Sequence, residues 1–419
     1  MDDVETQFRG DAETLEAWLP LHEKITAERF RAERENIFRR SWLYIGKTTA
    51  LMQPGSYFVK ELPTLNASLI VVRGTDGKVR AFHNVCRHRG NKLIRGGSGC
   101  EAAIRCGFHG WAFSPEGACV VVTDEHQFPL LDKSKLGLIA VACEVWNDFI
   151  FVSFAPQETL AEWLEDMWDQ YPGYFESHEK IGSYAVEIES NWNLGVNSFT
   201  EGYHTLYIHR NTVPDYQGGK GNPQRHRPFM QMMKHHTRYS APANPDHHET
   251  PAEALAWKHG NKLLPAATFR HEGLVAGVNP SRAEKWLFDV VELFPNNVML
   301  TGQHWHMVMT FWPLAANRTL MVQEAFAYKP KNMGERLSQE FFRSRGREVL
   351  REDLNTLEAQ HAALSSGAMR HAYLSRQEAA ILHHYRVADA MLRDAFVAAS
   401  GEAAMAERRI PQPMTGPAA

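Results

Sequence analysis

The sequence predicts an α+β protein with an all-β N-terminal half and a larger C-terminal half in which helices flank an antiparallel sheet. Three observations lead to this prediction. Residues 42–156 contain short strands and turn signals, residues 287–328 contain four further strands, and residues 333–364 have the spacing of a long helix. A chain of 419 residues also exceeds one ordinary core, so two or three domains are expected.

The N-terminal half begins with a short amphipathic helix, expected over residues 24–40. Turns are indicated by Asp76-Gly77 and Pro115-Glu116-Gly117. An acidic helical segment over 156–174 leads to the second half. The strands expected between these features are Trp42–Ile45, Tyr57–Val59, Leu69–Val72, Val79–Phe82 and Phe149–Val152.

The C-terminal half begins with a helix that we expect over residues 191–209. Residues 211–265 are rich in Pro, Gly, Asn and His and are expected to form a long loop. The tail from residue 402 has few large apolar residues and is expected to fray. The strands expected in this half are 287–294, 298–301, 304–312 and 319–328, followed by the helix over 333–364.

The composition, with 44% hydrophobic and 22% charged residues, is that of a soluble globular protein. The net charge is −4 and no lysine- and arginine-rich run occurs, so no nucleic-acid partner is expected. The acidic N-terminus lacks signal-peptide features, and no run of about eighteen apolar residues could span a membrane. Cys100, Cys119 and Cys143 are expected to be reduced thiols. We therefore expect a cytoplasmic protein without a membrane partner.

Two short loops carry one Cys and one His each. Cys86-Arg87-His88 is followed seventeen residues later by Cys106-Gly107-Phe108-His109. A Rieske [2Fe-2S] centre has this ligand set, with two thiolates on one iron and two imidazoles on the other. A structural zinc site uses the same donors, but zinc ligands usually come as a Cys pair and a His pair. The mixed pairs favour the cluster, with Cys86, His88, Cys106 and His109 as its ligands.

A second group of candidate ligands contains His204 and His209, which taken in isolation would more often be ordinary surface histidines and become ligand candidates beside the Cys/His loops. A non-haem Fe(II) that activates O2 is held by two His and one carboxylate. Five residues on a regular helix turn through about 500°, so the two rings would point about 140° apart. Both can bind one iron only if the helix ends or bulges between them.

The carboxylate of this second site must come from elsewhere in the chain. Asp353 falls close to one helix face with Phe342, Val349 and Leu357, so it is aligned with an apolar stripe. A solvent-facing helix Asp is the alternative, and the next candidates for the ligand are Glu352 and Glu358.

The chain resembles the Rieske non-haem iron oxygenases, the aromatic-ring-hydroxylating dioxygenase α-subunit family. The resemblance lies in Cys-Arg-His-Arg-Gly (86–90), Cys-Gly-Phe-His-Gly-Trp (106–111) and the downstream stretch 197–209. The resemblance spans most of the chain. It implies a helix-grip catalytic domain, one [2Fe-2S] cluster and one mononuclear Fe(II) per subunit, and Asp353 matches the position of the iron carboxylate. The expected domains are a helical segment (1–41) packing on the catalytic domain, the Rieske domain (42–156), the catalytic domain (157–400) and a tail (401–419).

Glu201 precedes His204 by one helical turn, so the two share a face. The resemblance implies that an acid here connects a Rieske histidine of one subunit to an iron histidine of the next. Most ring-hydroxylating members have Asp at this position. Glu occurs in members that oxidise alkylammonium compounds, though not only there, so the residue does not define the substrate class. Asn197, one turn earlier, is expected near the iron, with a helix-surface position as the alternative.

The resemblance implies the terminal oxygenase of a multicomponent system. The stretch Gly97–Ala102 matches a dinucleotide-binding fingerprint but lacks the βαβ context of such a site. The chain therefore has no expected nicotinamide site of its own, and electrons would come ultimately from NAD(P)H through a separate ferredoxin, a reductase or both. A homotrimer is implied, and the addition of β subunits is left open. The expected reaction is O2-dependent hydroxylation, as a dioxygenase or monooxygenase, of a sizeable, largely apolar aromatic small molecule. Candidate pocket residues are Trp305, Met307, Met309, Phe311 and Trp312.

Three alternatives stay open. The first is a monooxygenase that performs N- or O-dealkylation, for example on a quaternary ammonium compound. The others are a Rieske electron carrier and a zinc-stabilised binding protein. The remaining histidines are not expected to be ligands: His235-His236 and His247-His248 should be solvated, and His304 and His306 should line the pocket or face water.

Overall fold

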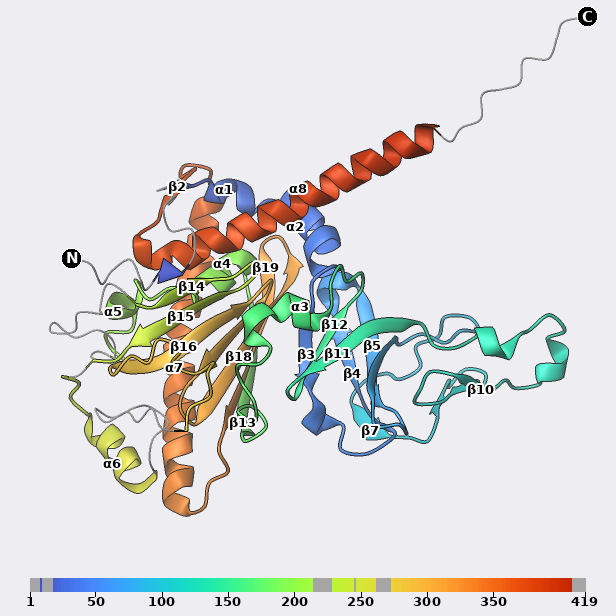
Figure 1. The fold of residues 1–419 in the computed structure, drawn as a ribbon, viewed down its shortest axis with the longest axis horizontal. Helices are drawn as coiled ribbons and strands as arrows, with labels where there is room; N and C mark the ends of the chain where they lie inside the picture. The colour runs from blue at the N-terminus through green and yellow to red at the C-terminus, as the bar shows by residue number, and fades with distance from the viewer. Residues whose placement is uncertain (1–7, 10–17, 214–227, 245, 261–272, 409–419) are drawn as a thin grey trace, which may run out of the picture.

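The computed structural model describes residues 8–9, 18–213, 228–244, 246–260 and 273–408. Two β-rich units lie beside each other along the longest axis of the molecule, with helices gathered around the unit that contains the C-terminal half (Figure 1). No helix in these ranges is both long and apolar enough to cross a membrane. The expected α+β architecture is confirmed.

The N-terminal unit is built from a seven-stranded antiparallel sheet in the order β3-β12-β11-β6-β5-β4-β7 and a three-stranded sheet in the order β10-β9-β8. The turn at Asp76-Gly77 forms as predicted, with the Gly74 N–H donating to the Lys78 carbonyl at 2.8 Å. The strands are β3 (Leu43–Lys47), β4 (Ser56–Leu62), β5 (Ala67–Arg73), β6 (Val79–His83), β7 (Ser98–Cys100), β8 (Ile104–Arg105), β9 (Ala112–Phe113), β10 (Cys119–Val121), β11 (Ala140–Trp146) and β12 (Phe149–Ser153).

The second unit contains an eight-stranded sheet in the order β1-β14-β15-β16-β17-β18-β19-β13. All neighbouring pairs are antiparallel except β1 and β14. The four strands expected between residues 287 and 328 are its centre. Its strands are β1 (Phe8–Arg9), β13 (Glu179–Ile188), β14 (Met230–Met232), β15 (Thr237–Pro242), β16 (Trp286–Leu293), β17 (Asn297–Thr301), β18 (Trp305–Ala315) and β19 (Arg318–Ala327).

Two long helices cover this sheet. Helix α7 (Met333–Ser365) is the predicted 333–364 helix, and α8 (Ala379–Arg408) runs across the top of the unit in Figure 1. The N-terminal half contributes α1 (Leu21–Lys24) and α2 (Ala27–Glu33), followed by a π-helical turn over Arg34–Phe38. The remaining elements are α3 (Leu160–Leu164), α4 (Trp192–Asn197), α5 (Thr205–Ile208), α6 (Pro251–Gly260) and the small pair β2 (Trp18–Leu19) and β20 (Ala372–Tyr373).

The N-terminal segment packs on the second unit through buried charges. Arg29 bonds both Glu33, at 2.8 Å, and Asp389 of α8, at 2.5 Å, and Lys24 reaches the same Asp389 at 2.7 Å. Glu33 is fully buried and accepts the indole N–H of Trp192 at 2.9 Å. Because Trp192 opens α4, these contacts fix the start of the segment that carries the candidate iron ligands.

The single helix expected over 191–209 is wrong. Helix α4 ends at Asn197, a loop follows, and α5 is one short turn from Thr205 to Ile208. The Glu201 carboxylate accepts the backbone N–H groups of Tyr203 and His204. A side chain that bonds nearby backbone N–H groups competes with a continuous helix, which explains the break.

The long loop expected over 211–265 is also wrong, because β14, β15 and α6 lie inside this range. Strand β15 pairs with β16 along its length, and this tertiary pairing outweighs a local sequence rich in loop-forming residues. Residues 214–227, 245 and 261–265 of the predicted loop lie outside the described residues. The predicted tail begins within α8, which continues to Arg408, and its remainder lies outside the described residues.

One hydrophobic core runs through both units. Phe38 packs edge-on against Trp192 with ring centroids 5.0 Å apart, and the same cluster includes strands of both sheets. Hydrogen bonds also cross between the units, from the Thr64 hydroxyl to the Pro313 carbonyl at 2.9 Å and between Tyr44 and Glu324 at 3.0 Å. The two units are therefore held in a defined relative position.

Candidate metal centres and substrate cavity

The two Cys/His loops have the same backbone design. In each loop the Gly four residues after the Cys donates its N–H to the Cys carbonyl at 3.0 Å, Gly90 to Cys86 and Gly110 to Cys106. Both glycines have positive φ, 74° and 75°, which L-residues with a Cβ rarely adopt. The two loops share a Cys followed four residues later by a Gly, and this spacing gives two matching turns. The turns present their Cys and His side chains to one another.

The four predicted cluster ligands meet between these turns. Nδ1 of His88 lies 3.2 Å from Nδ1 of His109, so both imidazoles face one point. The His88 ring stacks on Trp111, with centroids 4.8 Å apart, which fixes its orientation. Cys86 and Cys106 are both buried.

Hydrogen-bond donors surround the two sulfurs. Burial raises the pKa of the Cys86 thiol, although the N–H groups of His88 and Arg89 oppose this effect. Burial also opposes ionisation of Cys106, but the N–H groups of Phe108 and His109 outweigh it and hold the pKa of that thiol below its usual value. Facing imidazoles and sulfurs that accept N–H groups fit a cluster bound by two thiolates and two histidines.

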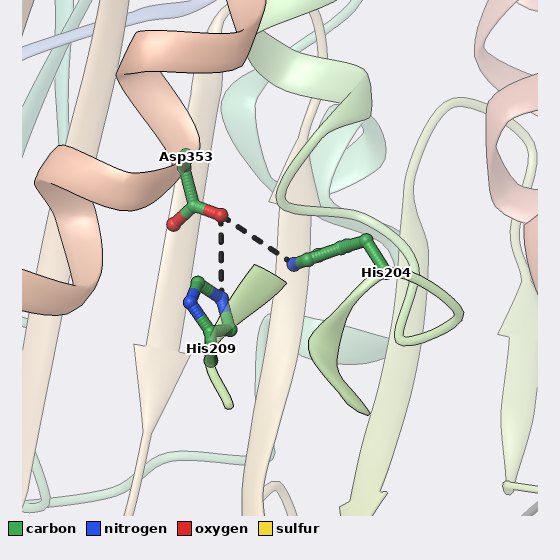
Figure 2. Close-up of side chains that lie close together, drawn as sticks. All are labelled: His204, His209 and Asp353. Carbon is green, nitrogen blue, oxygen red and sulfur yellow. Dashed lines mark ion pairs between the residues drawn. The ribbon is translucent and has the colours of Figure 1, made fainter. Parts of the chain in front are cut away.

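The candidate iron ligands also converge. His204 and His209 immediately flank α5, so the break in the predicted helix brings their rings to one side. Nε2 of His204 lies 3.5 Å and Nε2 of His209 lies 3.3 Å from the same oxygen, Oδ1 of Asp353 in α7 (Figure 2). That oxygen is buried without a hydrogen-bond partner, as expected where a metal ion takes the place of a donor. In the described ranges His204, His209 and Asp353, called the histidine trio below, form the only group of at least three residues with metal-site spacing.

Each histidine of this trio is held by a glutamate at its far nitrogen. Nδ1 of His204 contacts the Glu201 carboxylate, and Nδ1 of His209 lies 3.0 Å from Oε2 of Glu352. Burial opposes protonation of both rings, but the carboxylates outweigh it and raise the pKa of His204 and of His209. A carboxylate at Nδ1 fixes the tautomer that leaves Nε2 free for a metal ion.

Glu352 is thus a functional candidate that the sequence suggested only as a substitute ligand. It lies next to Asp353 in α7 and also accepts the Thr212 hydroxyl at 2.5 Å. The other substitute, Glu358, accepts the backbone N–H of Glu189 at 3.1 Å and is absent from the histidine trio. The sequence signal for Glu352 was its position next to Asp353 on the same helix. Adjacent helix residues differ by about 100° around the axis, so the two acids point in different directions and only one of them can take the ligand position.

Asn197 is buried, so the helix-surface alternative is wrong. Its amide Nδ2 donates to the Tyr385 hydroxyl at 2.9 Å, and its Oδ1 has no hydrogen-bond partner. It lines a surface groove of about 630 Å³ that also reaches Glu201, His204 and Asp353. Asn197 is therefore placed at the groove side of the site and anchors α4 to α8.

A central cavity of about 160 Å³ opens on the other side of the histidine trio. Its floor is a row of cross-strand neighbours on β15 to β18, namely Tyr239, Val290, Leu300 and Met307. Helix α7 forms the opposite wall. Of the five predicted pocket residues, Trp305, Met307 and Met309 line the cavity, whereas Phe311 and Trp312 do not.

Of the other histidines, His248 is exposed as expected, whereas His235, His236 and His306 are placed differently from the prediction. His235 and His236 are buried, and His235 stacks on Trp163 with centroids 4.2 Å apart. His306 is fully buried on the sheet face opposite the cavity, with its Nδ1 3.0 Å from Nδ1 of His178. It therefore neither lines the pocket nor faces water. The prediction rested on the polarity of histidine alone. It could not include the tertiary partners, such as Trp163 and His178, that bury these rings.

Comparison with known proteins agrees with this geometry. The family model described as the ring-hydroxylating α subunit (catalytic domain) matches residues 175–394, and that of the Rieske [2Fe-2S] domain matches residues 41–135. The chain is 30% identical over 204 residues to the carnitine monooxygenase oxygenase subunit of Escherichia coli strain K12, covering 46% of this chain and 52% of that protein. It is 33% identical over 195 residues to the large oxygenase component of the naphthalene 1,2-dioxygenase system of Pseudomonas aeruginosa, covering 44% and 43%. The matches thus span about half the length of these curated relatives.

Solved structures share the fold. Naphthalene 1,2-dioxygenase from Rhodococcus sp. bound to indole superposes with a TM-score of 0.71 at 19% identity, covering 90% of this chain and 94% of that chain. A quaternary ammonium Rieske monooxygenase superposes with a TM-score of 0.67 at 21% identity, covering 90% and 94%. Since the catalytic-domain model covers more than half of the sequence and a Rieske domain precedes it, this protein belongs to the Rieske non-haem iron oxygenase α-subunit family.

Proposed function

We propose that this chain is the terminal oxygenase component of a multicomponent Rieske system that hydroxylates a sizeable, largely apolar, aromatic small molecule with O2. Electrons would come ultimately from NAD(P)H through a separate ferredoxin, reductase or both. The observation that carries the proposal is the convergence of His204, His209 and Asp353 at the mouth of an apolar cavity. The cytoplasm is the proposed compartment, because the five cysteines, all among the described residues, form no disulfide.

The two metal centres would be held by residues in place for them. Cys86, Cys106, His88 and His109 would bind the [2Fe-2S] cluster, and the histidine trio's three side chains would bind the mononuclear iron. When bound, the cluster supplies electrons one at a time and the iron activates O2.

The chain's own residues orient the ligands and shape the reaction space. Glu201 and Glu352 hold the two imidazoles by Nδ1, so both Nε2 atoms stay aimed at Asp353. The apolar side chains of the sheet and of α7 line the cavity and would place an apolar substrate beside the trio.

A homotrimer is proposed on the basis of where the two sites lie. The cluster loops sit beside β10 at one end of the molecule, and α5 with the histidine trio sits near the other end (Figure 1). Electron transfer would then cross to a neighbouring copy that docks at the groove beside Glu201. The exposed Tyr207 and Tyr373 on that groove, and exposed Phe108 next to the cluster, support contact between copies. Whether β subunits join the trimer is left to measurement.

The second candidate function is N- or O-dealkylation by a monooxygenase, for example of a quaternary ammonium compound. Relatives support it as strongly as they support aromatic hydroxylation, because they include carnitine, choline and glycine betaine monooxygenases as well as a naphthalene dioxygenase component. The apolar cavity lining favours the aromatic substrate.

A single-turnover experiment tests the proposal. The iron-loaded, chemically reduced protein is exposed to O2 with naphthalene, indole, carnitine or choline, and products are identified by mass spectrometry. We expect a hydroxylated product from an aromatic compound and none from Asp353→Ala. A dealkylated product from the ammonium compounds alone would establish the second candidate. No product from any compound by protein with both metals loaded would contradict the oxygenase proposal.

A further inference from the structure

We propose that the substrate is neutral and carries one hydrogen-bond donor, such as a phenolic O–H or an indole-type N–H, which the side chain of Gln323 accepts. This inference rests on the proposed function, because it names the substrate class of the same cavity. It also assigns Gln323 as the residue that sets the orientation of the substrate.

Gln323 is a polar exception on an apolar wall. It lies in β19 opposite Met309 of β18 and Tyr184 of β13, and it lines the cavity. Its side chain is only 3% exposed. A buried amide without hydrogen bonds destabilises a fold, so such a residue requires a partner.

The partner within the chain is weak and satisfies only one end of the amide. Nε2 of Gln323 donates to the thioether sulfur of Met307 at 3.5 Å. A thioether is a poor acceptor. No donor in the described part of the chain bonds Oε1. The carbonyl end is therefore left to accept a donor from a molecule in the cavity.

The charges around the cavity do not suit a cation. Among the described lining residues the acids are Glu201 and Asp353, and both face His204. Arg345, which also lines the cavity, places a guanidinium at the wall and pairs with the buried Glu253 at 3.1 Å. A cationic substrate would lose its hydration and find no carboxylate of its own, and the charge of Arg345 is already balanced by Glu253, so a neutral molecule is favoured over a cation.

The donor requirement also follows from how polar groups give selectivity. A site built to bond one polar group rejects the matching ligand that lacks it, because the buried protein group then stays unpaired. An apolar wall contributes affinity but discriminates weakly between molecules of one shape. Gln323 is therefore the wall residue expected to distinguish an O–H or N–H from a methyl group.

Binding of a matched pair of probes tests the inference. The probes are 2-naphthol and 2-methylnaphthalene, which have similar shape and differ in hydroxyl against methyl. Dissociation constants are measured by calorimetry on the iron-loaded protein under anaerobic conditions, for the wild type, for Gln323→Leu and for Met309→Leu. Met309→Leu is the matched control, because it alters the neighbouring wall position without changing its polarity. Thermal melting of each variant confirms that it is folded.

We expect Gln323→Leu to weaken 2-naphthol relative to 2-methylnaphthalene by about tenfold, the effect of one net hydrogen bond. Met309→Leu should leave that ratio unchanged. An unchanged ratio in Gln323→Leu would overturn the role of Gln323. Tighter binding of choline or carnitine than of 2-naphthol by the wild type would overturn the neutral substrate class. Binding is read without turnover, so a failure of the oxygenase proposal would appear separately as absent product.

Discussion

Nδ1 of His209 lies 3.0 Å from Oε2 of Glu352, so the acid that precedes Asp353 in α7 holds the ring that faces Asp353. Helix α7 thus contributes a candidate ligand, Asp353, and also Glu352, which holds the candidate ligand His209 in place. Glu201 does the same for His204 from the loop between α4 and α5. The site is therefore fixed by two glutamates on separate elements, and each makes a testable contribution.

Glu352→Gln should lower the affinity for the mononuclear iron by about ten- to a hundredfold, because the amide no longer carries the charge that orients His209. Competition with a ferrous chelator measures this affinity, and the visible spectrum of the cluster should not change. Glu358→Gln is the control, since Glu358 bonds the Glu189 backbone instead of a candidate ligand. Equal iron affinity in Glu352→Gln and Glu358→Gln would contradict a role of Glu352 in iron binding.

Glu201→Gln should cut turnover by a factor on the order of ten to a hundred, and with iron supplied in excess the occupancy of the iron site should stay near normal. Its carboxylate lies between the cavity and the surface groove, where a second copy is proposed to dock. Glu201→Asp keeps the charge but shortens the reach, so it should lose activity as well. Single-turnover electron transfer from the reduced cluster shows which step fails. Full activity of Glu201→Gln would contradict a role of Glu201 in electron transfer.

Gly346→Ala should raise the free energy of unfolding by about 0.5–1 kcal/mol, because a helix-interior Gly is less favourable than Ala. The added Cβ would lie 3.4 Å from Cε of Met307, an ordinary contact inside the cavity. Gly334→Ala, near the start of the same helix, should lower stability, since its Cβ would lie 2.1 Å from the backbone oxygen of His259. Thermal melting compares the two, and a lower Tm for Gly346→Ala would contradict the prediction.

Stability should decrease as the pH falls from about 6.5 to 4. Burial, with Lys47 nearby, lowers the pKa of His178 to about 4. Because its pKa in the folded state lies below that of the unfolded chain, the unfolded chain binds more protons in this window and acid favours unfolding. The slope from this residue is about 1.4 kcal/mol per pH unit. Denaturant unfolding at each pH should show a shallower slope for His178→Gln than for the wild type, and parallel curves would refute this assignment.

Much of the fold follows from local patterns. The strands between 287 and 328 are apolar runs separated by turn signals, in keeping with their burial on both faces, and helix α7 has its buried residues at helical spacing. Strand β13 and helix α8 were not predicted, although both are long. The burial pattern of β13 alternates poorly because it lies at the sheet edge, so sequence periodicity gives little signal there.

The site was predictable as far as chemistry fixes residue types. The Cys/His spacing indicates cluster ligands by donor type, and the pair His204 and His209 indicates iron ligands only because it accompanies that motif. The supporting partners were harder to find, because Glu352 is one of several acids on an exposed helix face until the fold brings it to His209. Gln323 is similarly an ordinary strand residue until the sheet places it on the cavity wall.

The central claim is that one chain carries a [2Fe-2S] cluster and a separate iron at His204, His209 and Asp353. The most direct test measures iron per chain and the visible cluster spectrum for wild type, Asp353→Ala and Glu358→Ala. We expect about three irons in the wild type and in Glu358→Ala, and about two in Asp353→Ala with an unchanged spectrum. Three irons in Asp353→Ala, or a colourless wild type that contains zinc, would contradict the account.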